Sequence, residues 1–162
     1  MTGNDMLASA YQAAGKLMHM MADDLTPAEF TAQPIAGGNS VAWTIGHLAV
    51  TLSGTAKRLG ATDFPVIPPE LASKFTTTRR SADVQTDLGG PGELLPLFDA
   101  ALASVIGVVP NLTADQLSQP PRGRAPFSTT EGGAILFGAS HIILHAGQIS
   151  LIRRSLGKPP LV

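Results

Sequence analysis

The sequence predicts an all-α protein, a four-helix bundle with a long crossover connection. Four segments carry apolar residues at the three-and-four spacing of an amphipathic helix, and Gly, Pro, Asn and Thr cluster between them. Strand-like alternation of apolar and polar residues is nearly absent. Because helices of about 20 residues are each near 30 Å long, four of them can cover one another's apolar faces.

The first two helices are expected at residues 4–25 and 40–59. Asn4 is the expected N-cap of the first, because a short polar side chain there can accept a backbone N–H. Its apolar stripe consists of Leu7, Tyr11, Ala14, Met18, Met21 and Leu25. In the second helix, Asn39 and Ser40 are the expected start signals, and Gly60 supplies the residue type that most often ends a helix.

The other two helices are expected at residues 91–109 and 129–156. Pro91 begins the third at a first-turn position, where its missing N–H costs nothing. The fourth follows the motif Ser-Thr-Thr-Glu at 128–131, which predicts a capping box between Ser128 and Glu131. Arg153 and Arg154 fall in its last turn, where they are expected to interact with the helix dipole.

The connection at residues 61–90 is rich in Pro and Thr. Structureless loops in compact domains seldom exceed about 12–15 residues. We therefore expect a crossover packed along the bundle or over its mouth, with a single helical turn at 69–74. Such a crossover means that a simple up-down-up-down order of helices is not assured.

Two short stretches resemble each other, LTPAEF at 25–30 and LTADQL at 112–117, and each is followed by Gln-Pro. Each precedes a loop and then a histidine-bearing helix. An internal duplication of two helix–turn–helix halves would explain this pattern. The alternative is that both stretches are ordinary starts of short helices.

The composition indicates one soluble domain, residues 1–162, with an apolar surface. Hydrophobic residues make up 44% of the 162 residues and charged residues only 14%, against a usual charged share of about 25%. We therefore expect a homo-oligomer. The net charge of −1 provides no electrostatic reason for binding nucleic acid or an anionic membrane.

The absence of cysteine excludes disulfides, thiolate zinc sites, iron–sulfur clusters and a cysteine nucleophile. Any metal must be held by nitrogen and oxygen ligands. The first residues lack a basic region followed by an apolar run, so a cytoplasmic location is expected. The most apolar stretch, 134–152, contains His141, His145 and Gln148, which would be costly in lipid, and it is interpreted as a buried helix.

The histidines are the main functional signal. His141 and His145 are spaced i, i+4, which places both rings on one helix face and within reach of one ion, and Gln148 continues that row. The same spacing also occurs in helices whose histidines are separately hydrogen-bonded. His47 favours the metal interpretation, because it lies on the second helix, one turn after Trp43, and can converge with the other two if these helices are neighbours.

Three histidines and an open position are the ligands of a catalytic zinc-type site, although nickel, iron, cobalt or copper suit them as well. Ile142 occupies the position of the general base in the metalloprotease pattern His-Glu-x-x-His, which argues against a protease. Neither histidine-bearing helix has a carboxylate in its middle. The candidates for orienting the ligands are therefore backbone carbonyls and the side chains of Thr44, Thr51, Ser140 and Gln148.

Three other features have a functional and a simpler interpretation. Arg122 and Arg124 can clamp an anionic substrate, or they belong to a solvated loop. The glycine loop at 37–39 can hold an anion at a helix N-terminus, or it only leads into the N-cap. His19, beside the first apolar stripe, is interpreted as a surface histidine rather than a ligand.

Two blocks of sequence carry a family resemblance. They are WTIGHL at 43–48 and HIILHAGQI at 141–149, the latter followed by Arg153 and LGKPP at 156–160. Together they resemble the DinB-like (DinB/YfiT) superfamily of metalloenzymes. The resemblance implies a four-helix bundle of unusual connectivity, frequently dimeric, with one divalent ion, zinc or nickel. It places the three ligands at His47, His141 and His145.

The resemblance also implies a range of activities. Members include thiol-dependent S-transferases and a maleylpyruvate isomerase that use low-molecular-weight thiols such as mycothiol or bacillithiol. This chain lacks an acidic residue between the two histidines of its second block, which leaves an acid/base group unassigned. We expect a divalent-metal-dependent thiol S-transferase acting on a small molecule. The alternatives are a metal-assisted hydrolase and a non-enzymatic metal-binding dimeric bundle.

Overall fold

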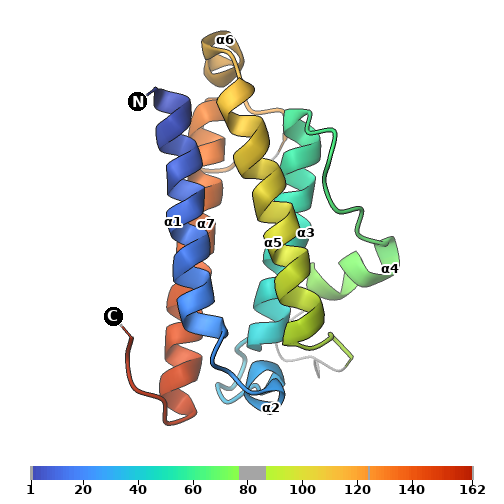
Figure 1. Ribbon diagram of the computed structural model, residues 1–162, viewed down its shortest axis with the longest axis vertical. Helices are drawn as coiled ribbons and strands as arrows, with labels where there is room; N and C mark the ends of the chain where they lie inside the picture. Colours follow the sequence, from blue (N-terminus) through green and yellow to red (C-terminus); the bar gives the residue numbers. More distant parts are fainter. Residues whose placement is uncertain (1, 77–86, 124, 162) are drawn as a thin grey trace.

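The computed structural model describes residues 2–76, 87–123 and 125–161, and all regular structure in them is helical (Figure 1). This confirms the all-α fold class. The long helices are α1 (Gly3–Ala22), α3 (Val41–Leu59), α5 (Pro91–Val108) and α7 (Glu131–Ser155). The short ones are α2 (Pro27–Thr31), α4 (Pro69–Ala72), α6 (Ala114–Ser118) and the 3-10 turns η1 (Ser73–Phe75) and η2 (Val109–Asn111).

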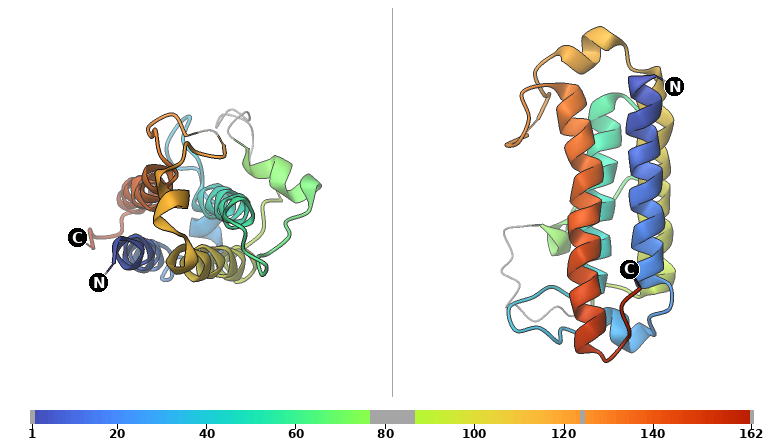
Figure 2. Two further views of the ribbon diagram at one scale, coloured as in Figure 1. Left: turned by 90° about the horizontal axis from the view of Figure 1, so that it is seen from above. Right: turned by 90° about the vertical axis from the view of Figure 1, so that its left-hand side faces the viewer.

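The long helices lie side by side, but not in the order of the chain. α1 packs against α7 and α5, and α3 packs closely against α5 and more loosely against α7 (Figure 2). Helices that follow each other in the sequence, α1 and α3, therefore occupy diagonal corners, as do α5 and α7. Along the long axis α1 runs parallel to α7, and α3 runs parallel to α5 (Figure 1).

The connection between α3 and α5 explains the parallel pair. Residues 60–68 leave the end of α3 and run along the outside of that helix to α4, and α5 starts beside the start of α3 (Figure 1). The expected turn at 69–74 is present as α4 and η1. Phe75 at its end is 1% exposed and anchors the segment to α3. Part of the predicted crossover, residues 77–86, lies outside the described residues.

The predicted ends of the second and third helices are confirmed. The Ser40 side chain accepts the Trp43 N–H at the start of α3, and Gly60 ends that helix with φ 89°. A residue with a Cβ would be strained in that left-handed conformation. Pro91 occupies the first turn of α5, as expected.

The predicted start of the first helix was wrong. Thr2 is the N-cap of α1 and forms a capping box with Asp5. The Asn4 amide instead donates to backbone carbonyls beyond α5, including that of Leu112 at 2.6 Å. Because Thr2 caps the helix two residues earlier, Asn4 lies inside the first turn, where its amide links α1 to the segment after α5. The helix ends at Ala22, before the expected limit at 25.

The predicted capping box of the fourth helix was also wrong. Thr130 is the N-cap of α7 and accepts the Gly133 N–H, so the helix begins at Glu131. Glu131 is 1% exposed and forms an ion pair with Arg58 at the end of α3. The guanidinium of the partly buried Arg58 is the stronger partner for this carboxylate, because an unpaired charge inside the bundle would be costly.

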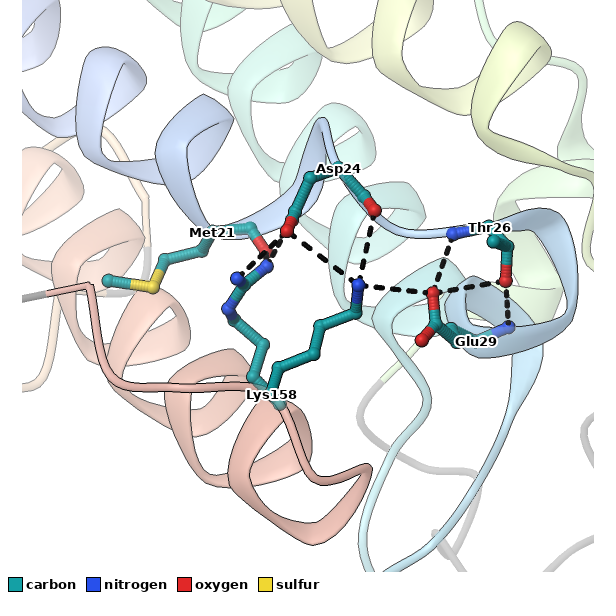
Figure 3. A network of polar contacts seen from close by, with 6 residues as sticks. Met21, Asp24, Thr26, Glu29 and Lys158 are labelled. Atoms are coloured by element: carbon teal, nitrogen blue, oxygen red, sulfur yellow. Dashed lines mark hydrogen bonds and ion pairs between the residues drawn. The ribbon is translucent and has the colours of Figure 1, made fainter.

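Arg153 has a larger role than the expected interaction with the helix dipole. It is 2% exposed, and its guanidinium donates to the Asp24 carboxylate and to the Met21 carbonyl (Figure 3). Lys158 lies beside the same group, 3.7 Å from Asp24 and 3.4 Å from Glu29. This network fastens the end of α7 to the turn between α1 and α2.

The two similar stretches form equivalent structures. α2 is capped by Thr26 and α6 by Thr113, each through a reciprocal capping box. Each short helix lies between two long ones, so the chain consists of two long–short–long segments. Duplication stays a hypothesis, but the shared sequence pattern has the same structural result in both halves.

Two helical segments of the described chain, Pro91–Asn111 and Glu131–Ser155, are long and apolar enough to cross a membrane by length and composition alone. Core helices of soluble proteins pass the same test. Here the inner faces of both segments pack against the other long helices. Ile135, Ile142 and Ile149 of α7 are fully buried.

Candidate metal centre

His47 of α3 lies beside His141 and His145 of α7. The cluster sits where α3 and α7 contact each other, which is a looser contact than that between α3 and α5. One nitrogen from each ring lies within 4.8 Å of the other two, and these three residues form the group of potential metal ligands found in the described part of the chain. The ring centroids are 5.3 Å apart for His47 and His141, 5.2 Å for His47 and His145, and 4.5 Å for His141 and His145. The three rings are steeply inclined to one another, with interplanar angles of 66–82°.

Two of the rings are held through Nδ1, on the side away from the cluster. His47 Nδ1 donates to the backbone carbonyl of Phe75 at 2.9 Å. A carbonyl only accepts, so the proton of a neutral His47 lies on Nδ1 and its Nε2 bears a lone pair. His145 Nδ1 lies 2.8 Å from Oε1 of Gln148, which produces the same tautomer. Both free lone pairs thus belong to Nε2.

The cluster disfavours protonation of its own histidines. Burial and, to a lesser extent, the neighbouring imidazoles of His141 and His47 lower the pKa of His145 to about 4, against the opposing effect of Gln148. Burial also lowers the pKa of His141, with an added contribution from His47. The pKa of His47 is lowered by burial despite its hydrogen bond to Phe75. All three side chains are therefore neutral at neutral pH.

Neutral imidazoles whose ring nitrogens lie this close together are suited to a divalent cation. Imidazole nitrogen is a good ligand for zinc, nickel and related ions. The Nδ1 hydrogen bonds of His47 and His145 are the partners that usually orient such ligands. The residues present therefore fit one metal ion with three protein ligands.

Aromatic rings border the cluster on both helices. Trp43 stacks on His47 with centroids 4.8 Å apart and planes within 8°. Phe137 lies one turn before His141, with its centroid 6.2 Å from that ring and its plane at 17°. Phe127, which is 75% exposed, packs against Phe137 at 4.9 Å. The border of the site is therefore apolar, and it reaches the protein surface at Phe127.

The other predicted site residues divide into two groups. Trp43 and Gln148 contact the cluster, as expected. Arg122 does not belong to it, because its backbone N–H donates to Glu131 and its guanidinium reaches the Arg58 carbonyl. Its role as a substrate clamp stays a prediction. Arg124 lies outside the described residues.

The hydroxyl side chains considered as supports bond elsewhere. Thr44 donates to the Ser40 carbonyl, Thr51 to the His47 carbonyl and Ser140 to the Leu136 carbonyl, all within their own helices. Gln148, by contrast with these hydroxyl side chains, lines a cavity of about 260 Å³. It carries no charged group and is lined by Ile35, Gly37, Gly38, Asn39, Thr44, Gln148, Leu151 and Ile152.

Sequence reasoning missed Phe75, Phe127 and Phe137 as parts of the site. Phe137 could have been found, because it lies four residues before His141 and so shares its helix face. Phe75 and Phe127 belong to connections whose placement depends on tertiary contacts.

His19 lies apart from the cluster, as expected. Its Nδ1 is 2.8 Å from Asp23, and its Nε2 is 2.7 Å from Asp99 of α5. Burial alone would lower the pKa of His19, but the hydrogen bonds and charges of Asp99 and Asp23 raise it overall. His19 is therefore an ion-pair residue between two helices.

An all-helical fold with a three-histidine cluster between two of its helices defines a class of proteins able to bind one metal ion through imidazoles. A model of the DinB superfamily matches residues 10–149, and the chain belongs to that superfamily. Its domains are generally soluble. The expected family is thus confirmed.

A solved structure shows a similar fold. A conserved protein from Enterococcus faecalis has 20% sequence identity to this chain and a TM-score of 0.75, with 98% of this chain and 99% of that one covered. At this identity the likeness shows the fold alone. No curated protein matches the chain.

Proposed function

We propose that the protein is a divalent-metal-dependent enzyme that transfers a low-molecular-weight thiol to a small electrophile. The observation that carries this proposal is the set of three neutral imidazoles, which no carboxylate joins among the described residues. A site of this kind favours Lewis-acid activation of a bound nucleophile over removal of a proton by a protein base. Zinc and nickel are the metals we expect.

The ligands would be His47, His141 and His145. When bound there, a divalent ion supplies positive charge that lowers the pKa of an approaching thiol and so generates the nucleophile near neutral pH. Three neutral ligands leave that charge undiminished. The Nδ1 hydrogen bonds to Phe75 and Gln148 hold two of the imidazoles in the tautomer that can bind the ion.

The aromatic residues beside the cluster, Trp43, Phe127 and Phe137, are proposed to exclude water and to bind the electrophile. Trp43, 6% exposed, covers one face of His47 and excludes water from it. Phe137 and Phe127 present an apolar surface beside His141, which suits an electrophile with a flat or apolar group. The low dielectric of such a border strengthens the interaction between an ion and a developing thiolate.

The test begins with elemental analysis of freshly isolated protein, for which we expect about one zinc or nickel per chain. Transfer from mycothiol, bacillithiol and simpler thiols to a panel of electrophiles is then measured. We expect turnover that requires both thiol and metal. Phe137→Ala should raise KM for an aromatic electrophile more than for a small polar one. Metal-loaded protein that accelerates no transfer would defeat the proposal.

Two alternatives have distinct outcomes in the same experiments. A metal-assisted hydrolase would turn over esters or amides without thiol, at a rate that rises through one ionisation near neutral pH. A non-enzymatic metal-binding bundle would bind the ion tightly and catalyse neither reaction.

We also propose a cytoplasmic homodimer. Support for the dimer comes from large apolar side chains exposed on α7, namely Leu136, Ile143, Leu144 and Leu151, which are 48–60% exposed. Contiguous apolar surface of this kind favours association. Sedimentation equilibrium would reveal the dimer.

A further inference from the structure

The partner of His47 comes from a distant part of the chain. The Phe75 carbonyl that accepts the His47 Nδ1–H belongs to η1, 28 positions further along the sequence. This hydrogen bond fixes the orientation of the His47 ring relative to α3. The place of the His47 ligand atom therefore depends on where the crossover segment rests against α3.

Phe75 rests in a notch on α3. Its side chain is 1% exposed, and its ring covers Gly46, the residue immediately before His47. A Cβ built on Gly46 would overlap three atoms of the Phe75 ring. Glycine at this helix position costs up to about 1 kcal/mol relative to alanine. Its presence is explained by the close approach of the ring.

Further contacts hold the segment on either side of this notch. The Ser73 hydroxyl donates to the Glu70 carbonyl within α4 and η1, at 2.8 Å. Lys74 Nζ donates to the Asp87 carbonyl at 2.6 Å, which links the two ends of the stretch between η1 and α5. Both contacts are exposed, so the buried Phe75 ring is the main anchor of the segment.

We propose that Phe75 is a positioning residue of the metal centre and that its contact with Gly46 sets the metal affinity of His47. The ring in the notch fixes the carbonyl, and the carbonyl fixes the tautomer and orientation of the imidazole. Removal of hydrogen-bond partners of metal-ligating histidines typically weakens metal affinity about 10- to 100-fold. The inference rests on the metal site of the proposed function, but not on thiol transfer.

The test compares Phe75→Leu and Gly46→Ala with a matched control. Phe75→Leu shrinks the side chain that fills the notch, and Gly46→Ala displaces the ring. Phe98→Leu is the control, because Phe98 is also fully buried but lies on α5, diagonal to α7. Zn²⁺ affinity is measured by competition with a chelating dye, and Ni²⁺ affinity by quenching of Trp43, the single tryptophan.

We expect both variants at the notch to bind Zn²⁺ and Ni²⁺ at least about 10-fold more weakly than the wild type. Phe98→Leu should lose comparable thermal stability and keep wild-type affinity. Equal affinity in folded Phe75→Leu and wild type would overturn the proposal, and so would equal weakening in Phe98→Leu. If Gly46→Ala does not fold, Phe75→Leu alone decides the outcome.

A second measurement needs no metal. Long-range ¹H–¹⁵N correlation spectra of the metal-free protein should show His47 protonated at Nδ1 in the wild type and a mixture of tautomers in Phe75→Leu. An Nε2-protonated His47 in the wild type would contradict the inference directly. A wild-type protein that binds neither ion would defeat the proposed function instead, so the two failures are distinguishable.

Discussion

The Nε2 atoms of His141 and His145 lie 3.0 Å apart, within hydrogen-bond distance of each other. His145 keeps its proton on Nδ1, because that atom bonds to the amide oxygen of Gln148, so its Nε2 can only accept. In the absence of a cation, His141 must then direct an Nε2–H at its neighbour. To bind an ion through Nε2, His141 would have to carry its proton on Nδ1 instead.

Removal of one ligand should abolish stable metal binding. His141→Ala leaves two imidazoles, and we expect its affinity for Zn²⁺ and Ni²⁺ to fall by more than the roughly 10- to 100-fold that is typical when only a ligand's hydrogen-bond partner is lost. Elemental analysis after gel filtration and Ni²⁺ quenching of Trp43 measure the effect. His19→Ala should retain wild-type metal content, because His19 bonds to Asp23 and Asp99 instead. Equal loss in both variants would show that the ligand set is wrong.

Acid should destabilise the metal-free protein. His145 has a pKa of about 4 in the folded state, whereas a histidine of the unfolded chain titrates near 6.5. The unfolded chain therefore binds more protons between these values. The free energy of unfolding is highest above about pH 6.5 and falls as the pH approaches 4, by on the order of 3 kcal/mol from this residue.

Urea unfolding in the presence of a chelator, at several pH values from 7.5 to 4.5, measures this slope. His145→Gln should show a shallower fall than the wild type over the same interval. If the two proteins have parallel pH profiles, the cluster is not the cause of acid sensitivity.

The contribution of His19 to the free energy of unfolding should depend on pH in the opposite direction, falling as the pH rises. Asp99 and Asp23 raise the folded-state pKa of His19 against the effect of burial. Its contribution to stability is therefore fully present below about pH 6.5 and lost as the pH rises through the raised value. His19→Gln should destabilise the protein by up to about 1 kcal/mol at pH 6 and by less at pH 8.5, as measured by urea unfolding. A larger loss at the higher pH would refute this assignment.

Gln148 should affect metal binding more than stability. Its Oε1 holds His145 Nδ1, while the residue itself is exposed, so few packing contacts are lost in Gln148→Leu. We expect metal affinity to fall about 10- to 100-fold with a melting temperature near that of the wild type. Gln148→Glu keeps an acceptor and should bind at least as tightly as the wild type. Dye competition and thermal unfolding together separate the two effects.

Asp24 should stabilise the end of α7. Its carboxylate pairs with the buried Arg153 (Figure 3), and hydrogen bonds from that guanidinium hold the pKa of Asp24 below its usual range. Asp24→Asn should lower the free energy of unfolding at pH 7 by about 1–3 kcal/mol. The exposed Asp63 provides the control variant Asp63→Asn, for which we expect a change within about 0.5 kcal/mol.

The contribution of Asp24 also has a predicted pH dependence. It is present above about pH 3.9, the ordinary carboxyl value, and is lost as the pH falls through the lowered folded-state pKa. Asp24→Asn and the wild type should therefore converge in stability only in strong acid. A constant difference down to pH 2 would mean that the ion pair is not responsible.

Local sequence signals predicted the helices because they act between near neighbours. The apolar stripe of α3, its Ser40 N-cap and its Gly60 end depend on residues within a few turns, and the structure confirms them. The same local rules failed at Asn4 and Glu131. Thr2 caps the first helix in place of Asn4, and Glu131 pairs with the distant Arg58 in place of the expected capping box.

The candidate site was predictable in part for the same reason. The i, i+4 spacing alone places His141 and His145 on one face of α7, and the family resemblance adds His47. The carbonyl of Phe75 and the ring of Phe127 were not predictable, because both belong to connections without a periodic pattern. Their positions depend on how those connections pack.

By itself the sequence determined that this chain is helical, which faces of its helices are apolar, and that two imidazoles lie one turn apart. These features follow from backbone geometry that repeats every few residues. Only the tertiary structure decided that α1 and α3 occupy diagonal corners, that α3 lies beside α7, and that a carbonyl 28 residues away holds His47. Such contacts depend on the path of the whole chain, because a short segment carries no information about which distant segment will cover it.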